Sequence, residues 1–117
     1  MKKVTRSPVD QYFNPVHISV ITEIVRQAME KDISGIYNIG SNEDISKFEF
    51  NQQVMRKFHF DEGYLEGITS PALAVTRPDN GTVSSRRIQK TLGYRIPPLG
   101  EMIEWLYEST RGCALIE

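Results

Sequence analysis

The chain has 117 residues, of which 39% are hydrophobic and 25% are charged, and its formal net charge is −1. This length allows one domain with a modest core and leaves no room for a second, independent catalytic domain. The balance of 14 basic against 15 acidic residues provides no broad positive field, so nucleic acid is not an expected partner.

The sequence offers no candidate for a membrane segment, a secretory signal or a metal site. No apolar run approaches the length of a membrane span, and none follows the basic residues at positions 2 and 3. Cys113 is the single cysteine, and His17 and His59 lie far apart without a zinc-binding spacing. We therefore expect a cytoplasmic protein without a disulfide, a bound metal or contact with a membrane.

Three parts are expected along the chain: an irregular polar segment at residues 1–14, a folded portion at 15–108 and a loose tail at 109–117. The folded portion begins with a helix after Pro15, because apolar side chains recur there at the helical period and charged residues take the opposite face. The apolar positions are Ile18, Ile21, Val25 and Ala28.

A strand and a second helix are expected next. Residues 35–40 are rich in β-formers and bounded by glycines, which favours a short strand. Ser46 and Glu49 have the spacing of a capping box, which predicts a helix from there to about residue 58. The side chains expected to be buried by this helix are Phe50, Val54 and Phe58 or their neighbours.

The pattern weakens over residues 59–78, where glycine and proline break the chain into short extended pieces. One or two strands are expected there, with Ile68, Leu73 and Val75 as their apolar members. A short helix over residues 86–92 is expected to end at Gly93, because glycine is the favoured C-terminal cap. A last helix follows the prolines at 97 and 98, with Leu99, Ile103 and Leu106 on one face.

Four motifs follow one another in this order. They are Asp10-Gln11 with Asn14-Pro15-Val16-His17, the G-x-Y-N-x-G run at 35–40, the S-x-x-E-F helix start at 46–50, and Arg77-Pro78-Asp79-Asn80 with the basic helix after it. Together they resemble the extended short-chain dehydrogenases, and the last is similar to the R-P-x-N-x-x-L-x-x-x-K run of the dTDP-4-dehydrorhamnose reductases. The resemblance covers residues 10–108 and implies a mixed α/β fold, the C-terminal substrate-binding portion of such a dehydrogenase.

The same resemblance shows which parts of the family's machinery are missing from this sequence. No glycine-rich dinucleotide turn occurs, and none of the five tyrosines has a lysine four positions later, so the Y-x-x-x-K pair is absent. The N-terminal Rossmann half is therefore missing, and we expect this segment to bind no cofactor, whereas NAD(P)H is implied for the complete family enzyme.

The family also implies that the first helix and the 35–40 strand pack on the nucleotide-binding sheet. Without that sheet, a strand edge and a helix face would be uncovered. We therefore expect either a missing Rossmann half or a second copy of the chain as partner.

Four residues are predicted to bind the substrate, and none is predicted to be catalytic. The resemblance places Arg77 on the substrate's diphosphate, for which a guanidinium fork is suited, although a loop arginine paired with Asp79 would fit the sequence too. Asn80 lies near the nucleotide in the family, but the turn-forming sequence around it favours a turn role. Asp10 and Gln11 match residues that line the active site, and capping or solvent exposure is the alternative.

The leading hypothesis is a segment that binds a nucleotide sugar, a dTDP-4-keto-6-deoxysugar, in a dTDP-4-dehydrorhamnose reductase-like protein, and that is catalytically incomplete by itself. The resemblance extends to regulatory subunits that keep the fold without using it for reduction. A non-catalytic interaction module is therefore the alternative, together with an inert truncated fragment.

Overall fold

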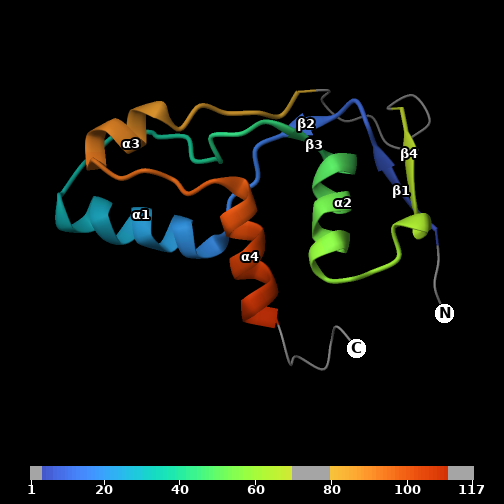
Figure 1. The fold of residues 1–117 in the computed structure, drawn as a ribbon. Coiled ribbons are helices and arrows are strands. Elements are labelled where there is room, and N and C mark those ends of the chain that lie inside the picture. The colour runs from blue at the N-terminus through green and yellow to red at the C-terminus, as the bar shows by residue number, and fades with distance from the viewer. Residues whose placement is uncertain (1–3, 70–79, 111–117) are drawn as a thin grey trace.

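The structure is a computed structural model and describes residues 4–69 and 80–110. Figure 1 shows α1 and α3 at one end of the molecule and α2 with strands β1 and β4 at the other, with α4 between them. The molecule is thin, with principal extents of 49 × 37 × 19 Å. In the part that the structure describes, no helix is long and apolar enough to cross a membrane.

Helix α1 (Ile18–Glu30) confirms the helix predicted after Pro15. Its first turn is capped by the side chain of His17, whose Nδ1 accepts a hydrogen bond from the Ser19 amide at 3.1 Å. Val20 and Ile24 are buried in the core, as the helical period requires. The apolar positions on the adjoining stripe, however, remain exposed, and they are Ile18, Ile21, Val25 and Met29.

Helix α2 (Lys47–Lys57) begins at the predicted capping residue, since the Ser46 hydroxyl accepts a hydrogen bond from the Glu49 amide at 3.1 Å. No α2 residue is fully buried, and the three side chains predicted to be buried are only half-buried. The Phe50 ring packs edge-on against Phe13 with centroids 5.4 Å apart.

Two short sheets connect distant parts of the chain. Strand β1 (Thr5–Pro8) pairs in parallel with β4 (Leu65–Ile68), and β2 (Tyr12–Phe13) pairs antiparallel with β3 (Ile45–Ser46). A 3₁₀ turn, η1 (Glu62–Tyr64), precedes β4. The strand predicted around Ile68 is confirmed, whereas Leu73 and Val75 lie outside the described residues.

Two predictions about strands were wrong. Residues 5–8 and 12–13 are strands, although 1–14 was expected to be irregular; their partners lie far along the chain, and local periodicity cannot reveal such a pairing. Residues 35–40 form no strand, because a strand needs a neighbour to complete its ladder. Among the described residues, the main chain of Tyr37, Asn38 and Ile39 makes no hydrogen bond.

The last two helices agree with the prediction. Helix α3 (Arg86–Leu92) ends at Gly93 in the left-handed conformation, with φ 64°, and α4 (Leu99–Thr110) follows the two prolines. Helix α4 therefore continues two residues into the segment expected to be a tail, and residues 111–117 lie outside the description. The core is formed by Val20, Ile24, Ile45, Ile88, Leu92, Ile96, Leu99, Met102 and Ile103.

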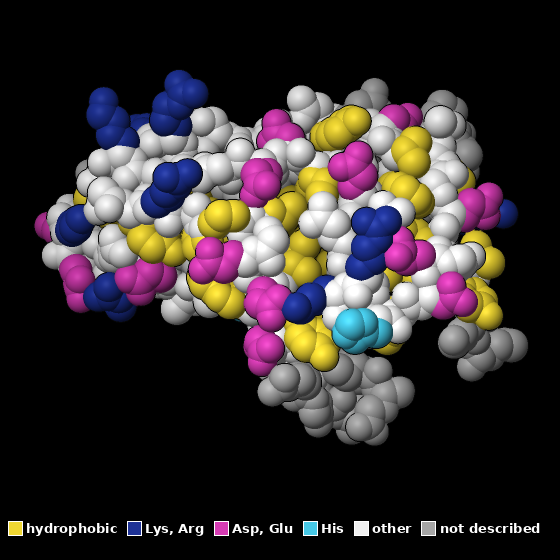
Figure 2. All heavy atoms as spheres, in the orientation of Figure 1, with side chains coloured by type: hydrophobic (Ala, Val, Ile, Leu, Met, Phe, Trp, Pro, Cys, Tyr) yellow, Lys and Arg dark blue, Asp and Glu magenta, His cyan; other side chains and the backbone are white. Residues whose placement is uncertain are grey.

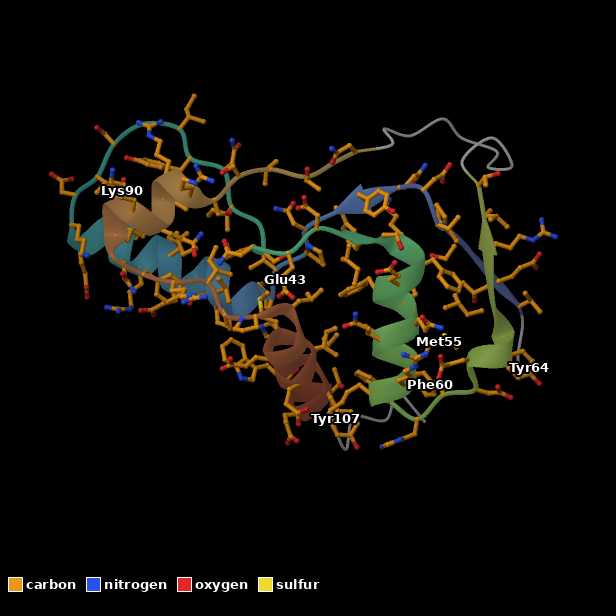
Figure 3. All side chains as sticks on the ribbon, turned by 45° about the horizontal axis from the view of Figure 1, so that its top comes forward. Glu43, Met55, Phe60, Tyr64, Lys90 and Tyr107 are labelled. Carbon is orange, nitrogen blue, oxygen red and sulfur yellow. The ribbon has the colours of Figure 1, made fainter. Side chains whose placement is uncertain are left out.

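Three contacts fix α4 against the rest of the molecule. At its start, a Glu43 carboxylate oxygen accepts a hydrogen bond from the Leu99 amide at 2.5 Å, and Figure 3 shows Glu43 beside this end of the helix. Further along, Tyr107 packs edge-on against Phe58 with ring centroids 5.3 Å apart. Lys57 of α2 and Glu104 of α4 form an ion pair at the same junction.

Candidate functional site

The structure brings three of the four predicted binding residues into one corner. Asp10 and Gln11 lie in the loop between β1 and β2, directly before Tyr12. Tyr12 forms a parallel bridge with Asn80, and the Gly81 amide donates to the Tyr12 carbonyl at 2.8 Å. Two segments about seventy residues apart in sequence therefore meet at the edge of the β2–β3 pair.

Gln11 is the best-enclosed member of this corner, with only 1% of its surface exposed. Its carbonyl accepts a hydrogen bond from the Lys47 amide at 3.0 Å, which ties it to the start of α2. Its side-chain Nε2 has no hydrogen-bond partner among the described residues. Leaving a buried donor unsatisfied costs about 1–3 kcal/mol.

Asn80 is exposed, and its side chain stabilises a turn. Its Oδ1 accepts hydrogen bonds from the Thr82 amide at 3.0 Å and from the Thr82 hydroxyl at 2.7 Å. This is the turn role that the sequence favoured for the residue. A contact of Asn80 with a nucleotide stays a prediction.

The other two predicted residues are less defined by the structure. Asp10 is half-buried and is not without an interaction partner. Arg77 lies outside the described residues, three positions before Asn80. Their roles in binding a substrate remain predictions.

Sequence reasoning missed the residue that holds this part of the molecule together, Asn14. Its Nδ2 donates to the Ser41 carbonyl at 3.0 Å and to the Val83 carbonyl at 2.5 Å, and its Oδ1 accepts from the Val83 amide at 3.1 Å. In the sequence, Asn14 before Pro15 indicated only a turn. A buried asparagine that bonds two distant segments has no local signature.

Ser85 makes a second link of the same kind. Its hydroxyl donates to the Gly40 carbonyl at 2.7 Å and accepts from the Gly40 amide at 2.6 Å. Beside this link lies a polar hollow of about 410 Å³ between residues 41–44 and 82–89, lined by hydroxyl and amide groups and by Arg86. Among the described residues, no group of histidine, cysteine or acidic side chains could hold a metal ion.

The model of the RmlD substrate binding domain matches residues 4–111 of this sequence. The chain belongs to this family. Curated relatives include methionine adenosyltransferase 2 subunit beta of Bos taurus, 28% identical over 90 residues, and that of Rattus norvegicus, 27% identical over the same length. Each match covers 71% of this chain and 27% of the relative.

Solved structures share the fold of this RmlD-type chain. A dTDP-4-dehydrorhamnose reductase from Bacillus anthracis, in complex with NADP, superposes with a TM-score of 0.79 and 15% identity, over 92% of this chain and 39% of that one. A dTDP-glucose 4,6-dehydratase from the same organism, in complex with NAD, gives a TM-score of 0.68 and 13% identity, over 98% and 38%. The chain thus spans about two-fifths of these structures, and the expected mixed α/β segment of an extended short-chain dehydrogenase is confirmed.

Proposed function

We propose that this chain is the nucleotide-sugar-binding segment of a dTDP-4-dehydrorhamnose reductase-like protein and that its ligand is a dTDP-4-keto-6-deoxysugar. Three findings support the proposal: the family to which the chain belongs, its likeness to the reductase fold, and the corner that collects Asp10, Gln11 and Asn80. The observation that carries most weight is the bridge between Tyr12 and Asn80, because it brings the segment of Asp10 and Gln11 to the segment that follows Arg77.

In this proposal the chain positions the substrate and does not carry out the reduction. Gln11 donates a hydrogen bond to the ligand, and Arg77 holds two oxygens of the diphosphate. The hydride comes from NAD(P)H held by a nucleotide-binding half, because this sequence has neither a glycine-rich turn nor a Y-x-x-x-K pair. The segment is therefore catalytically incomplete when it is alone.

A thermal-shift titration with dTDP-rhamnose, dTDP and NADPH tests the proposal, because a ligand that binds the folded state raises Tm. We expect the two dTDP ligands to raise Tm and NADPH to leave it unchanged. Arg77→Ala should abolish the shift, whereas Arg6→Ala should keep it, because Arg6 is an exposed arginine that pairs with Glu66 at 3.8 Å. Gln11→Met keeps the length of the side chain, removes its donor and should weaken the shift.

A second candidate function is a non-catalytic interaction module. The similarity to methionine adenosyltransferase 2 subunit beta favours it, since that relative is named as a subunit of a larger enzyme. A cooperative melt that no dTDP ligand shifts would favour this candidate over nucleotide-sugar binding. A shift that persists in Arg77→Ala would contradict the proposed diphosphate contact.

A further inference from the structure

The sequence Asn80-Gly81-Thr82 brings an electrophile and a nucleophile together within the main chain. Of the five asparagines in the chain, Asn80 alone precedes a glycine. The Gly81 nitrogen and the Asn80 side-chain carbon Cγ belong to adjoining residues, so a bond between them closes a five-membered ring. A reaction between two groups held together in this way is greatly favoured over the same reaction between separate molecules.

The fold activates the electrophile. Oδ1 of Asn80 accepts hydrogen bonds from the Thr82 amide at 3.0 Å and from the Thr82 hydroxyl at 2.7 Å. When a nucleophile attacks Cγ, negative charge develops on this oxygen, and two donors already aimed at it stabilise that charge. The turn that holds Asn80 therefore also polarises its side-chain amide toward attack.

The nucleophile is accessible but restrained. Glycine has no Cβ, so no side chain shields the Gly81 nitrogen. Its N–H donates to the Tyr12 carbonyl at 2.8 Å, beside an isolated bridge between Tyr12 and Asn80 rather than within a longer ladder. An isolated bridge beside a two-stranded sheet opens at a lower cost than an element of the core, and each opening frees the amide.

We propose that Asn80 is a site of self-modification, in which the Gly81 nitrogen converts the side-chain amide into a carboxylate through a succinimide. A solvent base removes the Gly81 proton, the N–Cγ bond forms, and the Cγ–Nδ2 bond breaks as Nδ2 takes a solvent proton and leaves as ammonia. Water then opens the ring at either of its two carbonyl carbons. The products are aspartate and isoaspartate at position 80, and the net change is one water taken up and one ammonia released.

The two products differ in their effect on this corner of the molecule. Aspartate keeps an acceptor oxygen for both Thr82 donors, so the turn survives. Isoaspartate routes the main chain through the former side chain and lengthens it by one carbon, so Gly81 moves out of register with Tyr12. The link between the two segments is therefore lost in the isoaspartate form.

Either product changes the formal net charge of the chain from −1 to −2, because a neutral amide becomes a carboxylate. Figure 2 shows acidic and basic side chains intermixed over one face of the molecule, in keeping with the small net charge. One added carboxylate is therefore a large relative change. Anion-exchange chromatography should separate the modified chain from the unmodified one.

Peptide mapping by mass spectrometry, after incubation of the folded chain at mildly alkaline pH, tests the proposal. We expect conversion of amide to acid at Asn80, with isoaspartate present, before conversion at Asn38. Asn38 is the internal control, because it is also exposed but precedes Ile39 and makes no hydrogen bond with the described residues. Conversion of both asparagines at equal rates, or acid at Asn80 without isoaspartate, would overturn the proposal.

Gly81→Ala tests the identity of the nucleophile. The new Cβ would lie 3.5 Å from the Tyr12 carbonyl oxygen, which is an ordinary contact, so the fold should be kept and circular dichroism unchanged. The methyl group hinders the approach of the nitrogen to Cγ, so conversion of Asn80 should be slower than in the wild type. An unchanged rate would indicate direct hydrolysis of the amide and contradict the ring.

Thr82→Val tests the activation by the fold, since it keeps the shape of the side chain and removes the hydroxyl donor. The folded variant should react about two- to tenfold more slowly, which is the worth of one hydrogen bond. In urea, where the turn is unfolded, the variant and the wild type should react at the same rate. Equal rates in the folded chain, or the same difference in urea, would overturn activation by the fold. No nucleotide takes part in these measurements, so they are independent of the proposed function.

Discussion

The side chain of Asn14 bonds Val83 through both of its polar atoms, although 69 residues separate the two in sequence. Nδ2 donates to the Val83 carbonyl and Oδ1 accepts from the Val83 amide. The same Nδ2 also donates to the Ser41 carbonyl. The segment after Asn80 is therefore fixed to the N-terminal loop. This link holds Gln11 and Asn80 in a defined position relative to each other.

Asn14→Ala should lower the free energy of unfolding by about 2–3 kcal/mol, because it leaves the buried carbonyl of Ser41 and two partly buried backbone groups of Val83 without partners. Urea denaturation measures this value. Asn38→Ala is the control, since Asn38 is exposed and makes no hydrogen bond with the described residues, and it should change the value by less than about 0.5 kcal/mol. Equal effects of the two substitutions would contradict a special role for Asn14.

Gly40→Ala should be destabilising for a related reason. A Cβ at this position would lie 2.6 Å from Nδ2 of Asn14, and crowding of that kind costs about 1–3 kcal/mol. In the double variant with Asn14→Ala the clash is removed. The double variant should therefore lose less stability than the sum of the losses in the two single variants. A double-mutant cycle in urea measures the coupling, and strict additivity would argue against the contact.

Two glycines should respond in opposite ways to alanine. Gly93 caps α3 at φ 64°, so Gly93→Ala should cost about 1 kcal/mol from backbone strain alone, because nothing crowds the new Cβ. Gly100 lies in the first turn of α4 with open space around it, so Gly100→Ala should be neutral or stabilise by up to about 1 kcal/mol. Thermal melts of both variants give the comparison, and a stabilising Gly93→Ala would contradict the assignment of the cap.

Glu43 should stabilise α4 from outside the helix. Its carboxylate accepts the Leu99 amide at the positive end of the helix, as a capping residue would, so Glu43→Ala should cost about 1–2 kcal/mol. Glu43→Gln keeps an acceptor without the charge and should fall between wild type and alanine. Asp44→Ala, at the exposed neighbouring position, serves as the control in the same urea series. If Glu43→Ala and Asp44→Ala had the same effect, Glu43 would have no capping role.

The ion-paired face of α1 predicts a pH dependence. The guanidinium of Arg26, with the amide of Gln27, lowers the pKa of Glu23 from 4.5 to about 2. A folded-state pKa below the unfolded value stabilises the protein above pH 4.5, and this contribution is lost as the pH falls through 2. The effect is small because solvent screens the pair. The difference in urea midpoint between wild type and Glu23→Gln should therefore shrink from pH 5 to pH 2, and a constant difference would contradict the shift.

The sequence by itself determined the four α-helices, although not the end of α4, because periodicity and capping are local properties. The Ser46 cap and the left-handed Gly93 are examples, since each depends only on residues within a turn of the helix. The motifs also identified the family correctly, because they depend on residue order alone. Local signals could not reveal β1, whose partner lies about sixty residues along the chain.

The tertiary structure decided the rest. It showed that residues 35–40 form no strand, because a ladder needs a neighbour that this chain does not offer in its described part. It placed Asp10 and Gln11 beside Asn80, and it revealed Asn14 as the residue that holds their surroundings in place. It also left half of the apolar face of α1 in solvent. Periodicity identifies an apolar face, but only packing in three dimensions determines which part of that face is covered.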